Sequence, residues 1–205
     1  MRILNNFEQN SPEWLEERRG KITGSKLYDV LTFKGTNKKI GFFQLIADKL
    51  SITDESEDGN ERGHALEQEA LEKVAGLLDV KIDVVGFCVR EDYPDIGLSP
   101  DGLISNDGKY TEAVEVKCLS GARHIEAWYN QKLPTDFQLQ AIQYFIVNDD
   151  LETLYFAFYD PRIAVISLHY LTIEREELKD DIEKYLQEQI NTLNEVNEIV
   201  NKLSF

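Results

Sequence analysis

The stretch Leu98-Ser99-Pro100-Asp101-Gly102-Leu103, followed by Ala113-Val114-Glu115-Val116-Lys117, decides how this chain folds. Between the two lies Asn106-Asp107-Gly108, which has strong turn chemistry, so residues 101–104 and 113–119 are predicted to be adjacent strands. The period of two along a strand places Glu115 and Lys117 on the same face. Asp101 is expected to meet Glu115 at one end of the sheet.

Two carboxylates and an ammonium group on such a face are costly to desolvate unless something compensates their charge. Mg²⁺ can do so, because it prefers oxygen ligands and keeps several waters. A metal-bound water with a lowered pKa is a natural nucleophile. Lys117 would orient that water or stabilise negative charge developing on a phosphate. Asp101 and Glu115 are therefore candidate metal ligands.

The alternative is that these are ordinary surface residues at strand ends, because short motifs match by chance. The apolar neighbours Ala113, Val114 and Val116 favour a mostly buried strand, in which the Glu115 charge needs a partner.

The rest of the chain alternates between helical and strand patterns. Helix starts are predicted near Ser11 and Thr23, and the order of elements predicts an α+β fold, or α/β with a mixed sheet. No repeat, low-complexity stretch or proline-rich linker interrupts it, so residues 1–205 are expected to form one domain. Helices are predicted over residues 40–50, 61–78, 123–129, 135–147 and 174–205, strands over 80–89, 153–159 and 164–171, and a loop over 53–60.

The amino-acid composition limits the cell compartment in which the chain can work and the partners that it can bind. The chain carries 22 Lys+Arg and 38 Asp+Glu, a formal net charge of −16, whereas proteins that spread over DNA are usually basic. An acidic chain can still act on DNA if its basic groups line an enclosed groove. No run of about 18 apolar residues or signal peptide is present, and the two cysteines fit a reducing cytoplasm.

Pro100-Asp101 and Glu115-Val116-Lys117 match the PD-(D/E)XK nuclease signature. Over residues 14–176, the chain resembles lambda-type phage exonucleases, which belong to the viral recombinase family of PD-(D/E)XK nucleases. The resemblance implies a restriction-endonuclease-like core: a mixed central sheet, flanking helices and a long C-terminal helix. It also rests on the ordered segments Trp14…Arg18-Arg19-Gly20-Lys21-Ile22-Thr23-Gly24-Ser25, Gly63…Glu67, Phe137-Gln138-Leu139-Gln140, Tyr155-Phe156-Ala157-Phe158-Tyr159-Asp160-Pro161-Arg162 and Leu168-His169-Tyr170.

The resemblance implies a 5′→3′ exonuclease that degrades one strand of linear double-stranded DNA and leaves a 3′ single-stranded tail. Such an enzyme uses Mg²⁺, for which Mn²⁺ can substitute. It forms a homo-oligomer, usually a trimeric ring, and acts beside a single-strand annealing protein in phage recombination. The chain would then be phage or prophage encoded and work in the cytoplasm of a bacterial host.

By the same resemblance, Asp101, Glu115 and the backbone carbonyl of Val116 hold the metal, and Lys117 is the catalytic lysine. Glu67 corresponds to a further carboxylate near the metals. Without the family, Glu67 would be predicted to lie on a solvated helix face.

A glutamine motif behind the active site is matched by Gln138 and Gln140, which are assigned with the catalytic residues. An alignment from Tyr155-Phe156 backwards places Gln143 there instead, so the register stays open.

Arg18 and Ser25 match positions that hold the 5′-phosphate in the family. Lys34 is the candidate for a further basic phosphate contact. His124 follows the lysine strand and is a candidate DNA contact, although a polar loop histidine is as good an interpretation.

Two other functions compete with the exonuclease. The same carboxylates and lysine could serve a PD-(D/E)XK endonuclease, although a terminal-phosphate pocket favours an enzyme that needs DNA ends. A non-catalytic acidic protein that mimics DNA would fit the charge, but it has no need of Glu115 and Lys117 on one buried strand.

Overall fold

The computed structural model describes residues 37, 39, 40, 43, 47, 59–85, 88–93, 96–98 and 100–203, without the side chains of residues 59–65 and 193–203. The helix starts predicted near Ser11 and Thr23 lie outside these residues. Ile40, Phe43 and Ala47 are helical, as predicted for residues 40–50. None of the described helices is long and apolar enough to cross a membrane.

A four-stranded mixed sheet forms the centre of the fold, in the order β3-β4-β5-β6. The β3–β4 and β5–β6 pairs are antiparallel and the β4–β5 pair is parallel. A parallel pair needs a crossover connection, which here contains helices α5 (Gly121–Asn130) and α6 (Gln138–Val147). The strands are β3 (Gly102–Asn106), β4 (Lys109–Lys117), β5 (Thr153–Tyr159) and β6 (Leu168–Glu174).

The tight turn between β3 and β4, together with a register shift of one residue between Ile104 and Ser105, brings Asp101 beside Glu115. Asp107 and Gly108 have positive φ angles of 51° and 82°, as the favoured two-residue hairpin turn requires. Gly102 pairs with Val114, so Asp101 lies at the end of β3 next to Glu115. The predicted hairpin is confirmed.

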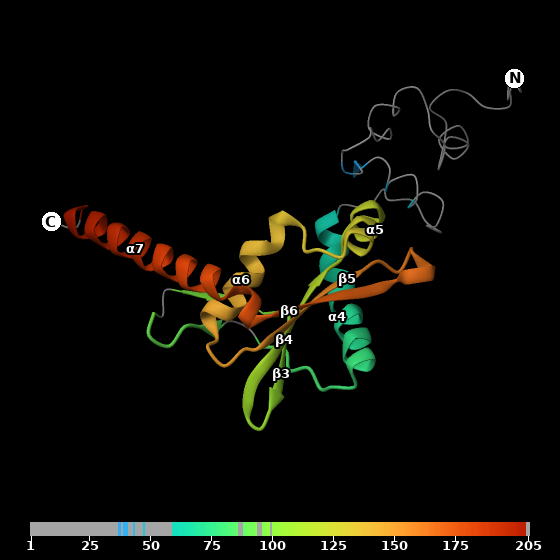
Figure 1. Cartoon of the computed structure of the whole chain (residues 1–205), viewed down its shortest axis with the longest axis horizontal. Helices are drawn as coiled ribbons and strands as arrows, with labels where there is room; N and C mark the ends of the chain where they lie inside the picture. Colours follow the sequence, from blue (N-terminus) through green and yellow to red (C-terminus); the bar gives the residue numbers. More distant parts are fainter. Residues whose placement is uncertain are drawn as a thin grey trace, which may run out of the picture.

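Helices cover both faces of the sheet (Figure 1). On one face, α4 (Gly59–Leu78) packs its residues Ala70, Leu71 and Val74 against Val114 and Val116 of β4. The other face packs against α6 (Gln138–Val147) and the first part of α7 (Lys179–Leu203). Because side chains alternate along a strand, Glu115 and Lys117 lie on the side of α6. The predicted mixed sheet with flanking helices and a long C-terminal helix is confirmed.

The strand predicted over residues 80–89 is wrong for most of its length. Among the described residues 80–85, only Asp83 forms a bridge, with Leu103 at the edge of β3, and a two-residue strand β1 (Cys88–Val89) pairs with β2 (Gly97–Leu98). A Cβ on Gly102 would lie 2.3 Å from Cγ2 of Ile82. The segment therefore crosses the β3 edge closely at one point and does not run along it.

Other boundaries differ from the predictions by smaller amounts. Helix α4 begins at Gly59, so the loop predicted for residues 53–60 is wrong at its last two positions, and residues 53–58 are not described. Residues 164–166 form the 3₁₀ helix η3 (Ala164–Ile166), and β6 begins only at Leu168. The remaining predicted segments are confirmed as α5 (Gly121–Asn130), η2 (Thr135–Phe137) with α6, β5, and η4 (Arg175–Leu178) with α7, except that Glu174, predicted as helical, is the last residue of β6.

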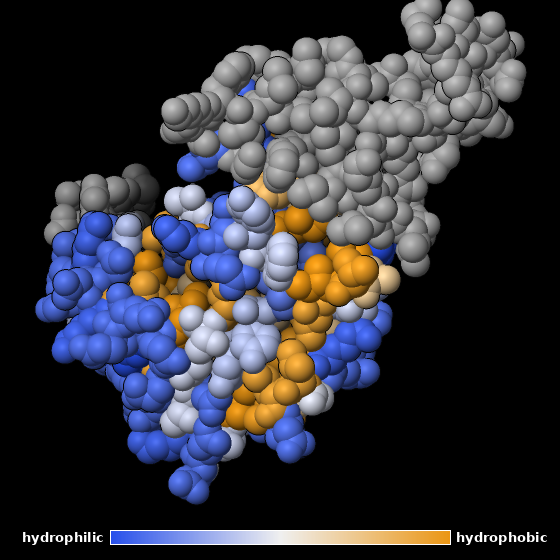
Figure 2. Space-filling view, turned by 45° about the vertical axis from the view of Figure 1, so that its right-hand side comes forward, coloured by the Kyte–Doolittle hydropathy of each residue, from blue (hydrophilic) through white to orange (hydrophobic). Residues whose placement is uncertain are grey.

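Apolar side chains also reach the surface of the described part. Figure 2 shows apolar residues in patches between hydrophilic ones on the face that this view presents. The most exposed large apolar residues among those described are Val165, Val84 and Leu77, at 76 %, 73 % and 59 %.

Two histidines join α5 to the far strands. His124 is fully buried and its Nε2 lies 2.7 Å from the backbone oxygen of Ile166. The Nε2 of His169 lies 3.1 Å from the backbone oxygen of His124, and the two rings contact edge to face at 4.7 Å. Burial, aided by the charge of His124, lowers the pKa of His169 to about 4. His169 is therefore neutral in the folded protein at neutral pH.

We predict that this histidine makes the fold sensitive to acid. The folded pKa lies below the unfolded value of 6.5, so stability is lost as pH falls from about 6.5 to about 4. Between about pH 7.5 and pH 5, His169 should account for a loss of about 1–2 kcal/mol, allowing for its partial exposure. Urea unfolding of His169→Gln should show a smaller pH dependence than wild type. An equal dependence in both proteins would contradict the prediction.

Candidate active site

Glu115 is a buried carboxylate at the centre of the site. Its residue is 1 % exposed on β4, and it accepts hydrogen bonds from three described side chains. Lys117 Nζ and Gln140 Nε2 donate to Oε1 at 2.5 and 2.6 Å, and the Tyr144 hydroxyl donates to Oε2. A buried carboxylate needs such donors, because it has lost its hydrating waters. The apolar strand predicted around Glu115 is thus confirmed.

Asp101 lies beside Glu115, where β3 begins. Its Oδ2 accepts the backbone N–H of Val116 at 2.7 Å, and its own N–H donates to the Tyr144 hydroxyl oxygen at 3.2 Å. Burial, followed by the negative charge of Glu115, raises the pKa of Asp101 to about 7. Glu67 raises this pKa further, whereas Lys117 and the Val116 N–H lower it. The two carboxylates therefore repel each other more strongly than Lys117 alone compensates.

Lys117 is held between a carboxylate and an aromatic ring. Its Nζ lies 5.4 Å from the centre of the Phe137 ring, in addition to its contact with Glu115. The Arg123 guanidinium also lies 5.4 Å from that ring and pairs with Asp136. Cations are attracted to ring faces, so Phe137 helps to fix the ammonium group at the end of β4. Phe137 was not predicted as a site residue.

The donor set suits Mg²⁺. Asp101 and Glu115 offer carboxylate oxygens, and their uncompensated charge would be neutralised by a divalent cation. The N–H and C=O of one strand residue point to the same side, so the Val116 carbonyl faces Asp101 as its N–H does. No group of three or more His, Cys, Asp or Glu side chains that could hold a metal occurs in the described part of the chain. Mg²⁺ commonly uses one or two carboxylates and keeps several waters, so this set is sufficient.

Helix α6 contributes Gln140 and Tyr144, which lie one turn apart on one face. Burial, with the charges of Glu115 and Asp101, raises the pKa of Tyr144, so its phenol stays protonated and can donate to Glu115. Tyr144 was not predicted as a site residue, although its position four residues after Gln140 was a usable signal.

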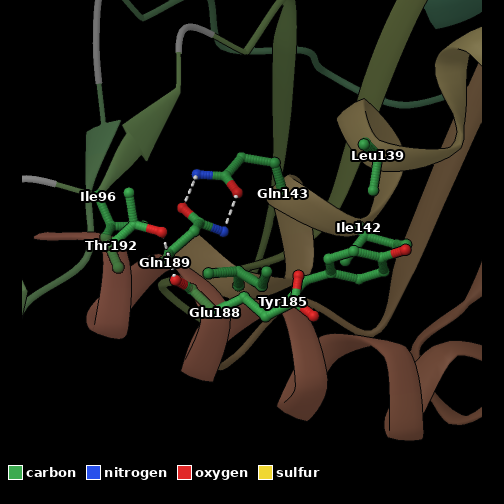
Figure 3. A pocket seen from close by; sticks show the side chains of 9 residues that line it. Ile96, Leu139, Ile142, Gln143, Tyr185, Glu188, Gln189 and Thr192 are labelled. Carbon is green, nitrogen blue, oxygen red and sulfur yellow. Dashed lines mark hydrogen bonds between the residues drawn. The ribbon is translucent and has the colours of Figure 1, made fainter. Parts of the chain in front are cut away.

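The other two glutamines do not reach Glu115. Gln138 is exposed at the start of α6, two residues from Gln140 and therefore on another face, so its assignment with the catalytic residues is not supported. Gln143 and Gln189 of α7 exchange hydrogen bonds of 3.3 and 2.8 Å (Figure 3). Gln143 also donates to the backbone oxygen of Gly97 at 3.1 Å. Of these three glutamines, Gln140 is the one that hydrogen-bonds Glu115, which favours it for the glutamine motif.

Two of the remaining predicted residues lie in the described part of the chain, and three lie outside it. Glu67 is half-buried on α4 and close enough to influence Asp101, although not in a three-carboxylate cluster. His124 lies on α5 and not in a loop, and its side chain is fully buried, which disfavours the predicted DNA contact. Arg18, Ser25 and Lys34 lie outside the described residues.

A known protein family matches the part of the chain that contains this site. The YqaJ-like viral recombinase domain matches residues 13–150, about two thirds of the chain. The chain belongs to this family. The matched range contains Asp101, Glu115, Lys117, Gln140 and Tyr144, whereas α7 lies beyond it. The resemblance to a viral recombinase-type exonuclease is confirmed. No curated protein matches the chain.

Solved structures similar to this YqaJ-like domain extend the likeness beyond residue 150. An alkaline exonuclease from Laribacter hongkongensis, LHK-Exo, is 25 % identical with a TM-score of 0.62. The alignment covers 95 % of this chain and 98 % of that one. The structure of LHK-Exo in complex with dAMP, at 24 % identity, TM-score 0.61 and the same coverage, shows the same fold.

We predict that neutralising Asp101 stabilises the metal-free YqaJ-like domain. Because the pKa of Asp101 is raised from 3.8 to about 7, its ionised form is disfavoured in the folded state, and stability is lost as pH rises from about 4 to about 7 and stays lost above that. Asp101→Asn should raise the unfolding free energy at about pH 8 in EDTA by about 1–3 kcal/mol. Asp107→Asn, in the exposed turn, is the control and should change little. A destabilised Asp101→Asn protein would contradict this prediction.

Proposed function

We propose that this chain is a Mg²⁺-dependent 5′→3′ exonuclease that degrades one strand of linear double-stranded DNA and leaves 3′ single-stranded tails. The observation that carries the proposal is the buried Glu115 on β4, flanked by Asp101 and Lys117 at one end of the sheet. Membership of the YqaJ-like viral recombinase family supports a nuclease role, and LHK-Exo is itself an alkaline exonuclease.

In this proposal Asp101, Glu115 and the Val116 carbonyl hold the Mg²⁺, or Mn²⁺ in its place. A bound divalent ion lowers the pKa of water and stabilises charge on a phosphoryl oxygen. Gln140 and Tyr144 fix the Glu115 carboxylate, which reduces the reorganisation needed when the negative charge of the reaction develops. Lys117 supplies a positive charge at the same strand end, where it can orient water or stabilise the phosphate.

Two parts of the proposal rest on the resemblance to lambda-type phage exonucleases: the need for a DNA end and the 5′→3′ direction of degradation. Arg18 and Ser25 would hold the 5′-phosphate, with Lys34 as a further basic contact. An arginine fork suits a terminal phosphate.

The proposed assembly is a trimeric ring that acts beside a single-strand annealing protein in phage recombination. A ring would reconcile DNA binding with the net charge of −16, because acidic residues can face outward while basic ones line the channel.

The first experiment is a cleavage assay on 5′-phosphorylated linear duplex DNA and on a covalently closed circle. We expect Mg²⁺-dependent loss of the linear DNA only. Lys117→Ala should lower the rate by about 10²–10³-fold, because it removes a preorganised charge. Lys109→Ala, an exposed lysine on the same strand, is the matched control and should retain full activity.

The other outcomes of this assay identify a different function. Cleavage of the closed circle would favour an endonuclease. Absence of cleavage under every condition would overturn the proposal and favour an acidic protein that mimics DNA and inhibits a basic partner.

The three glutamines give a second prediction. Gln140→Leu should lower kcat by about tenfold, because Glu115 loses one of its donors. Gln138→Leu should have little effect on kcat, since Gln138 is exposed on another face. Gln143→Leu should mainly reduce thermal stability, because its partners are Gln189 and Gly97. A larger fall in kcat for Gln143→Leu than for Gln140→Leu would contradict this assignment.

A further inference from the structure

The C-terminal end of α6 is held by two arginines from distant parts of the chain. The last carbonyls of a helix have no partner within it and carry the negative end of its dipole. In α6, Asn148 N–H caps the Tyr144 carbonyl at 3.2 Å. The carbonyls of Phe145 and Ile146, the next two residues, accept hydrogen bonds from Arg175 and Arg90.

Arg175 makes the larger set of contacts. Its Nη2 donates to the carbonyls of Phe145 and Asn148 at 2.8 and 2.6 Å, and its Nε donates to the carbonyl of Leu151 at 2.5 Å. The guanidinium also lies 5.4 Å from the centre of the Phe145 ring. All of its hydrogen-bond partners among the described residues are backbone carbonyls. A planar fork with five donors can serve three carbonyls at once, whereas a lysine ammonium cannot match that geometry.

Both arginines are fixed to the strands. Arg175 follows β6, and its N–H donates to the carbonyl of Glu152, next to β5, at 2.8 Å. Arg90 follows β1; its Nη1 reaches the Ile146 carbonyl at 2.5 Å, and Asp149 at 2.7 Å. The position of α6 relative to the strands is therefore set at its C-terminal turn by two buried or half-buried cations.

That turn carries a residue of the site. Tyr144, whose carbonyl is capped within it, donates its hydroxyl to Glu115 and accepts the N–H of Asp101. A small rotation or shift of the helix end would move this hydroxyl away from both Glu115 and Asp101. Outer partners that orient metal-ligating carboxylates commonly change metal affinity 10–100-fold when they are mutated.

We propose that Arg175 is a positioning residue of the nuclease site: through the C-terminal turn of α6 it fixes Tyr144, and through Tyr144 the carboxylate of Glu115. Arg90 supports the same turn. The inference rests on the proposed function for its link to catalysis. The coupling between Arg175 and Tyr144 can be measured without DNA cleavage.

The test is a double-mutant cycle read by Mn²⁺ affinity in calorimetric titration, with Arg175→Lys, Tyr144→Phe and the double variant. Arg175→Lys keeps the charge and loses the fork. Each single change should weaken Mn²⁺ binding by about 5–10-fold, and the double change by little more than either, because both act on the same carboxylate. The KM for DNA should stay unchanged while kcat falls.

Tyr159→Phe is the matched control. Tyr159 is equally buried, but its hydroxyl bonds Glu69 of α4 on the opposite face of the sheet. This change should leave Mn²⁺ affinity unaltered and should combine additively with Arg175→Lys in thermal stability. If Arg175→Lys does not fold, Arg90→Lys tests the same turn.

The outcomes separate the two proposals. An Arg175→Lys protein that melts earlier but binds Mn²⁺ as tightly as wild type would show a purely structural role and overturn the inference, as would additive effects with Tyr144→Phe. Wild-type protein that binds Mn²⁺ with the expected coupling but cleaves no DNA would overturn the proposed function alone. Wild-type protein that binds no Mn²⁺ would overturn both.

Discussion

A carboxylate buried on a central strand is the constraint on which the arrangement of this molecule depends. Glu115 is 1 % exposed and has exchanged water for Lys117, Gln140 and Tyr144. An ionised group in such a place is strongly unfavourable unless its donors are held in position. The chain meets this requirement from two elements, the end of β4 and one face of α6. Docking of α6 on the sheet and formation of the site are thus the same event.

The negative charge at this point is only partly balanced by the protein. Asp101 stands next to Glu115, and burial, followed by the negative charge of Glu115, raises its pKa. A site that folds with excess negative charge and little freedom to rearrange would suit a cation. The same excess makes the isolated fold less stable than it could be, a common compromise at functional sites.

Several basic side chains of this acidic chain act inside the described part and not on its surface. Arg90 and Arg175 bind the end of α6, Arg162 pairs with the fully buried Asp160, and Lys117 binds Glu115. Each of them satisfies carbonyls or a carboxylate that folding removes from water. Fewer positive charges are therefore left for the surface than a net charge of −16 suggests. Composition alone gives a poor guide to what such a protein binds.

The sequence by itself determined the features that depend on neighbouring residues. The Asn106-Asp107-Gly108 turn, the apolar frame of Glu115 and the alternation that places Lys117 beside it are local, and the hairpin followed from them, whereas the pairing of Asp101 with Glu115 also needed the register shift between Ile104 and Ser105. Only the tertiary structure decided which glutamine of α6 serves Glu115, that Tyr144 joins it and that His124 is buried. It also decided that residues 80–89 cross the β3 edge and do not extend the sheet. These outcomes depend on how a helix is rotated against a sheet and on which edges are already paired. Contacts between residues far apart in the chain set both, and the local pattern does not contain them.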